Sequence, residues 1–145
     1  MSATLNRLVH LRLNEISPDV YEECLQIATP LVRDQNLLPG IMSILAQRNV
    51  RSSENISFII SVAYYLFAPH KLYSNNIKLA AGIRSTIKDG LGFNNAESIN
   101  HYSTVILPMW KNPRYRQRVE TEATEIMNLL DEAQSGLITR ESQIQ

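Results

Sequence analysis

The chain has 145 residues, of which 44% are apolar and 19% are charged, with acidic and basic side chains in equal number. This is the composition of a folded globular protein, and it excludes a wholly disordered chain. Because the net charge is zero, it also excludes a uniformly basic protein, so a nucleic-acid surface would have to be local. The only cysteine, Cys24, cannot form an intramolecular disulfide, and its apolar neighbours predict a buried thiol in a reducing compartment.

Neither a secretion signal nor a membrane span is predicted. The N-terminus has an amphipathic helix pattern interrupted by arginines, and it lacks a continuous apolar segment. The most apolar run, residues 56–68, is far shorter than the about 20 residues that a membrane span requires. We therefore expect a cytoplasmic protein without a membrane partner.

The N-terminal half predicts four helices, because apolar residues recur with the 3.6-residue helical period and no period-2 strand pattern lasts. They cover residues 3–15, a segment that starts at Pro18 and kinks or ends at Pro30, residues 40–48 and residues 54–67. The last of these is apolar on nearly all sides, so we expect the other helices to surround it. We expect the N-terminal helices to support this core.

The C-terminal half predicts three more helices. One covers residues 77–91 and ends at Gly92 as a left-handed cap; the next covers residues 95–107. Asn94 and Glu97 have the spacing of a capping box for that second helix.

A long last helix is predicted from Pro113 to about residue 134, ended by Gly136. The predicted fold is therefore all-α, a compact bundle of six or seven helices around a buried central helix at about 54–67. Residues 1–136 are expected to form one globular domain and residues 137–145 a frayed tail.

Charge is distributed unevenly along the chain. Residues 1–69 have a net charge of −1, residues 70–118 carry eight basic and two acidic side chains for +6, and residues 119–145 have −5. In the last helix the arginines come first, where the helix dipole disfavours cations. Two explanations are open: the arginines contact an anion such as phosphate, or they pair with acids on neighbouring helices.

The two helices at residues 77–107 resemble the helix-turn-helix superfamily of DNA-binding units, over about a fifth of the chain. Gly92 permits the sharp turn between them. Two features depart from the superfamily pattern: the turn is one residue longer than the tightest form, and the second helix has no arginine or lysine before Lys111. Glu97, at the start of that helix, would repel phosphate.

The resemblance implies double-stranded DNA as a partner and a dimer or higher oligomer. It implies that polar residues on the outer face of the second helix read base edges, and that nearby cations contact phosphates. The base-reading candidates are Asn95, Ser98, Asn100, His101 and Thr104. The phosphate-contact candidates are Lys78, Arg84, Lys111, Arg114 and Arg116.

No pattern points to catalysis. The three histidines lack the spacing of a metal site, and no glycine-rich phosphate loop is present. We therefore predict a non-enzymatic protein without a metal, a cofactor or a small-molecule substrate.

Two functions follow from these patterns. The leading one is DNA binding by a small regulator or an accessory protein of a phage or mobile element. The alternative is a helical protein–protein interaction or assembly module without nucleic-acid contact. Its basic segment would then meet an acidic protein surface, for example the acidic last helix of a second copy.

Overall fold

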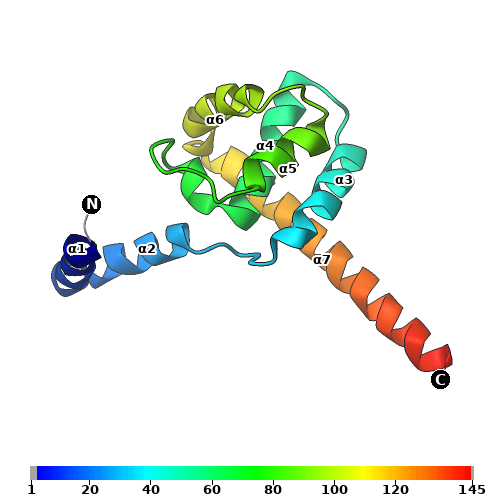
Figure 1. Ribbon diagram of the computed structural model, residues 1–145, viewed down its shortest axis with the longest axis horizontal. Helices are drawn as coiled ribbons and strands as arrows, with labels where there is room; N and C mark the ends of the chain where they lie inside the picture. The colour runs from blue at the N-terminus through cyan, green and yellow to red at the C-terminus, as the bar shows by residue number, and fades with distance from the viewer. Residues whose placement is uncertain (1–2, 145) are drawn as a thin grey trace.

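The computed structural model describes residues 3–144, and their side chains as far as residue 133. These residues form seven α-helices and two short 3-10 helices, η1 (Gln35–Leu37) and η2 (Pro69–Leu72), and contain no strand. The predicted all-α class is therefore confirmed. Figure 1 shows a packed body with a two-helix arm at one end and the last helix extending from the other.

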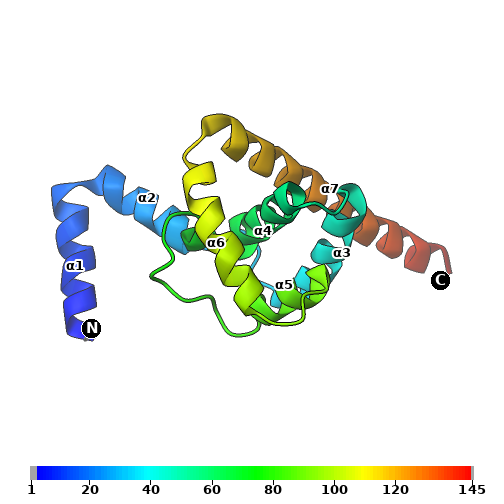
Figure 2. The same cartoon turned by 90° about the horizontal axis from the view of Figure 1, so that it is seen from above.

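Five helices form the body: α3 (Leu38–Arg48), α4 (Ser53–Phe67), α5 (Ile83–Leu91), α6 (Glu97–Trp110) and α7 (Pro113–Ile144). Helix α4 contacts each of the other four. Helices α5 and α7 lie on opposite sides of α4, as Figures 1 and 2 show together. Residues on α5 and on α7 therefore face different surfaces of the protein.

Helix α4 lies inside the body, and eleven of its fifteen residues are buried. It begins where the Ser52 side chain accepts a hydrogen bond from the Asn55 N–H at 3.1 Å, and it ends just before Pro69. Its polar atoms are satisfied internally: Ser61 Oγ lies 2.8 Å from the Ser57 carbonyl and 2.6 Å from Tyr115 Oη. Helix α4 can therefore lack a solvent-exposed face, because its apolar residues pack against other helices on all sides.

Helices α1 (Ala3–Ile16) and α2 (Pro18–Ala28) form the arm, which projects away from the body (Figure 2). Within the described part of the chain, neither helix contains a buried residue. The expectation that the N-terminal helices support the core is therefore wrong, and Cys24, predicted to be buried, is exposed. The connection to the body is fixed at buried Val32, whose N–H donates to the Leu66 carbonyl at 2.9 Å.

Three predicted helix boundaries in the C-terminal half are also wrong. Helix α5 begins at Ile83 instead of residue 77, because Gly82 takes a left-handed conformation (φ 90°) that interrupts the helix before it. Helix α6 extends past residue 107 to Trp110, with Pro108 in its last turn. Helix α7 continues through Gly136 to Ile144, since a single glycine inside a helix costs only about 1 kcal/mol.

Candidate anion-binding site

The turn between α5 and α6 is held by backbone and side-chain hydrogen bonds. Gly92 ends α5 in the left-handed conformation (φ 71°), as predicted. The helix α6 begins just after Ala96, and the side chain that bonds its first N–H groups is that of Asn95, whose Oδ1 accepts from Glu97 (3.1 Å) and Ser98 (3.3 Å). The predicted capping role of Asn94 is therefore wrong, because the neighbouring Asn95 has it. The side-chain amide oxygen of Asn95 already accepts two hydrogen bonds.

Arg84 fastens the same turn to α5. Its Nε and Nη2 atoms both donate to the Ala96 carbonyl, at 3.2 and 3.1 Å. A guanidinium has five N–H donors in a fixed plane, so two bonds to one carbonyl set its orientation and leave other donors available.

A pocket of about 530 Å³ opens beside Arg84, between α4, α6 and the irregular segment that precedes α5. Four of the ten residues that the sequence proposes for DNA contact meet here: Lys78, Arg84, Asn100 and Thr104. The pocket floor includes Tyr64, whose buried hydroxyl is hydrogen-bonded to Ser103 on α6. The structure therefore brings two of the predicted cations together with two of the predicted polar residues.

Lys71 also lines this pocket, and the sequence prediction missed it. It lies on η2 and is only 9% exposed. Burial, and secondarily the nearby Arg84 cation, lower its pKa below the usual lysine value. No sequence signal could have identified it, because it follows Pro69 in a segment that predicts a solvated loop.

The other base-reading candidates lie elsewhere. His101 is exposed on a different side of α6, where it lines a separate hollow with Ser53 and Tyr102. Ser98 is half-buried, and it is not among the residues that line the pocket. The polar residues predicted to share one face of α6 therefore lie on two different sides of the helix.

The remaining phosphate-contact candidates are also separated from the pocket. Lys111 is exposed at the junction of α6 and α7, and Arg114 and Arg116 lie on the first turn of α7. Arg114 lines a second hollow together with Arg118, whose guanidinium lies 4.8 Å from the centre of the Phe58 ring. The block of eight cations that is continuous in sequence therefore does not form one surface.

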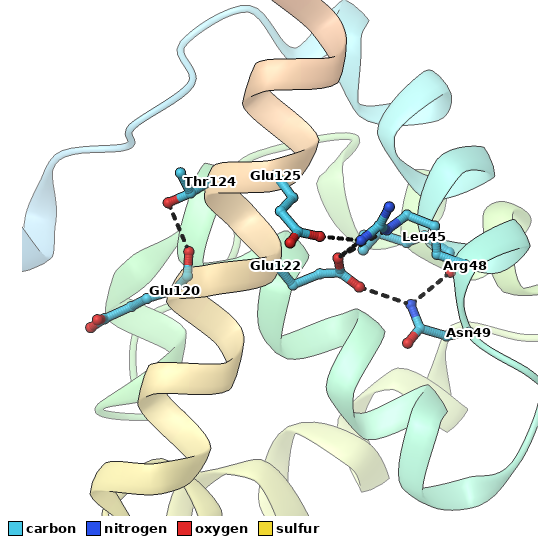
Figure 3. Close-up of polar contacts among 7 residues, drawn as sticks. All are labelled: Leu45, Arg48, Asn49, Glu120, Glu122, Thr124 and Glu125. Carbon is cyan, nitrogen blue, oxygen red and sulfur yellow. Dashed lines mark hydrogen bonds and ion pairs between the residues drawn. The ribbon is translucent and has the colours of Figure 1, made fainter.

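The acids of α7 have a partner on α3, as Figure 3 shows. Arg48 Nε donates to Glu122 at 2.9 Å, and its Nη2 forms ion pairs with Glu122 (2.8 Å) and with Glu125. Asn49 adds a hydrogen bond to Glu122 at 3.3 Å. Among the described residues these α7 acids pair with α3, and no ion pair joins them to the arginines at the start of α7.

The described residues contain neither a metal-ligand cluster nor a membrane-spanning helix. Their histidines, cysteine and carboxylates form no group of three that could hold a metal ion. No described helix is both long and apolar enough to cross a bilayer. No family model matches the chain, and neither a curated protein nor a solved structure matches it significantly.

Proposed function

We propose that this protein is a non-enzymatic helical assembly module that associates with a second copy of itself through the arm formed by α1 and α2. The observation that supports the proposal is the exposure of the arm's apolar side chains. Leu8 is 58% exposed, Leu11 54% and Ile16 68%. Val9, Val20 and Leu25 are also exposed.

Single exposed apolar residues are ordinary on a protein surface, but a contiguous group marks an association surface. On α1, Leu8 and Leu11 are three positions apart and Val9 and Ile16 are seven apart, so these residues share one broad side of the helix that a second helix can cover in part. The body meets the arm at η2, yet no described residue of α1 or α2 is buried, so the proposal assigns the cover of this stripe to another chain.

Charge favours a second copy as that chain. Helix α1 carries Arg7 and Arg12 against one acid, Glu15. Helix α2 carries three acids and no basic residue: Asp19, Glu22 and Glu23. If α1 of each copy lies on α2 of the other, both contacts bring opposite charges together and the twofold arrangement closes on itself.

An apolar hollow of about 410 Å³ extends this surface from the arm onto the body. It runs from Ile27 at the end of α2 to Tyr73 and Trp110. Aromatic side chains are typical of the central part of protein interfaces. A dimer could therefore bury the arm and its junction with the body together.

The test is the mass of the full chain in solution, measured by sedimentation equilibrium over a wide concentration range. We expect the native chain to be a dimer, and Leu8→Glu/Leu11→Glu to be a monomer with unchanged helicity. Val50→Glu is the matched control, since Val50 is an apolar residue 83% exposed outside the arm. A native chain that stays monomeric at about 100 μM would contradict the proposal, because apolar interfaces of standard size bind more tightly.

Reversed charges sharpen the test. Arg7→Glu/Arg12→Glu should weaken the dimer, and adding Glu22→Arg/Glu23→Arg to the same chain should restore it. If the second pair of substitutions weakens association further, the arms do not pair α1 on α2.

DNA binding is a second candidate function, favoured by the meeting of Lys78, Arg84, Asn100 and Thr104 around one pocket. Its test is fluorescence-anisotropy binding of a random-sequence duplex at low and moderate salt. Binding that weakens steeply with salt would support phosphate contact. The double variant Arg114→Glu/Arg116→Glu shows whether the start of α7 takes part; absence of binding by the folded native chain at about 50 mM salt would rule the function out.

A further inference from the structure

The pocket beside Arg84 combines positive charge with hydrogen-bond donors, and no carboxylate lines it. Its cations are Lys71, Lys78 and Arg84. Amide and hydroxyl groups of Asn75, Asn100 and Thr104 complete the polar rim. Its volume of about 530 Å³ lies in the range of small-ligand sites.

Lys71 is the decisive residue. Lysines with so little exposure are usually paired. The ammonium nitrogen of Lys71 is not among the fully buried polar atoms that lack a partner, so the charge meets the solvent of the pocket. At 9% exposure Lys71 has no hydrogen bond or ion pair to any described side chain, and its neighbours in the pocket are two further cations. Burial, and after it the nearby Arg84 cation, lower the pKa of Lys71.

Arg84 and Tyr64 give the pocket a fixed geometry. The two bonds from Arg84 to the Ala96 carbonyl orient the guanidinium, and the Tyr64–Ser103 hydrogen bond holds α4 against α6 at the floor. Asn100 and Thr104 are one helical turn apart on α6, so both can reach the same ligand. A site made from such constrained groups is pre-organised, which lowers the entropy lost on binding.

The start of α5 adds a further favourable field. Gly82 lines the pocket immediately before the nine-residue helix. The N–H groups of a first helical turn have no acceptor within the helix and carry partial positive charge, which attracts anions.

We propose that this pocket binds the phosphate group of a ligand, with Lys71, Lys78 and Arg84 as its charged contacts. Phosphate fits because its several oxygens can accept from ammonium, guanidinium and amide donors at once. The site does not depend on association through the arm. The phosphate could belong to a free phosphorylated molecule or to a nucleic-acid backbone, and the experiment separates these sources.

The first experiment titrates the full chain with inorganic phosphate and with pyrophosphate by calorimetry, at constant ionic strength adjusted with chloride. We expect saturable binding with a Kd of about 1 mM or tighter. Lys78→Gln should weaken it about tenfold or more, the usual effect of losing a charge-assisted hydrogen bond. Lys111→Gln is the matched control: it removes an exposed cation of the same basic block that does not line the pocket, and it should leave the affinity unchanged.

Lys71→Met gives a second, independent readout. It keeps the length of the side chain, removes the unpaired charge and should abolish binding, while the thermal midpoint without ligand stays the same or rises. If this variant does not fold, exposed Lys78 keeps the proposal testable. Absence of saturable binding, or binding that survives in both pocket variants, would overturn the proposal.

Competition identifies the source of the phosphate. A random-sequence duplex that binds, is displaced by pyrophosphate and is lost in Lys78→Gln would assign the pocket to a nucleic-acid backbone. Pyrophosphate binding without duplex binding would assign it to a small phosphorylated molecule. If the duplex binds but pyrophosphate neither binds nor displaces it, the duplex contacts another surface and the pocket proposal fails.

Discussion

Helices α1 and α4 are similar in length and both contain apolar residues at the helical period. Helix α1 is nevertheless exposed to solvent, whereas α4 is buried. Helix α4 has eleven buried residues, and α1 has none among the described residues. The difference lies in what surrounds each helix, because α4 contacts four other helices of the body whereas α1 meets α2 at the corner of the arm. An amphipathic pattern therefore predicts that the apolar face of a helix packs against another surface. It does not indicate whether that surface belongs to the same chain or to another one.

The largest expected effect is a difference between the two helices in how much a substitution lowers the free energy of unfolding. Ile60 on α4 is fully buried, so Ile60→Ala should lower the free energy of unfolding by about 2–5 kcal/mol. Leu11→Ala in the arm should change it by less than about 0.5 kcal/mol at concentrations where the chain is monomeric. Urea unfolding followed by circular dichroism measures both, and equal losses would show that the arm packs on the body.

A second expected effect tests how closely the body is packed. A Cβ atom added at Gly90 would lie 2.7 Å from Met42 Cβ, so α5 approaches α3 only because this residue is glycine. Gly90→Ala should cost about 1–3 kcal/mol by overpacking.

Gly40→Ala is the control for that substitution. Nothing lies within 4 Å of its added Cβ and the residue is inside α3, so alanine should stabilise by about 0.5–1 kcal/mol. A neutral Gly90→Ala would show that α3 and α5 can separate without loss.

A third, smaller effect concerns the buried tyrosines. Burial raises the pKa of both Tyr64 and Tyr115. For a phenol with a raised folded pKa, the stability is fully present below the unfolded pKa of about 10 and is lost as the pH rises towards the folded value. We expect the thermal midpoint to fall above about pH 10.

Tyr115→Phe should make that alkaline decline shallower and cost about 0.5–1.5 kcal/mol at neutral pH through the lost bond to Ser61. The cost stays small because Ser61 keeps its bond to the Ser57 carbonyl. A decline that is as steep in the variant as in the native chain would assign it to other groups.

Much of the fold was predictable because local signals coincide. The run at residues 54–67 is apolar on all sides, preceded by Ser52 and followed by Pro69, and these three features define α4. Gly92 likewise marks the end of α5. The start of α5 was not predictable, since residues 77–82 continue the helical period although Gly82 adopts a conformation outside it.

The candidate site was predictable only in part. Lys78, Arg84, Asn100 and Thr104 follow from the helix-turn-helix resemblance, although DNA contact stays a prediction. Closeness in sequence predicts that Arg114 and Arg116 join them, but the chain crosses to the other side of α4 before α7 begins (Figure 2). The burial of Lys71 depends on tertiary packing, which no local pattern encodes.

The smallest expected effect lies at the contact of α3 with α7. Arg48→Gln removes the ion pairs to Glu122 and Glu125, which are partly solvated and therefore contribute little. The loss of stability should be largest at low ionic strength and should disappear as salt screens the charges. At concentrations where the chain is monomeric, Arg12→Gln is the control, because its pair with Glu15 lies in the exposed arm and joins no separate elements. Parallel thermal scans at low and high salt measure both variants. A salt-independent loss at Arg48 would show that its hydrocarbon stem stabilises the contact, instead of its charge.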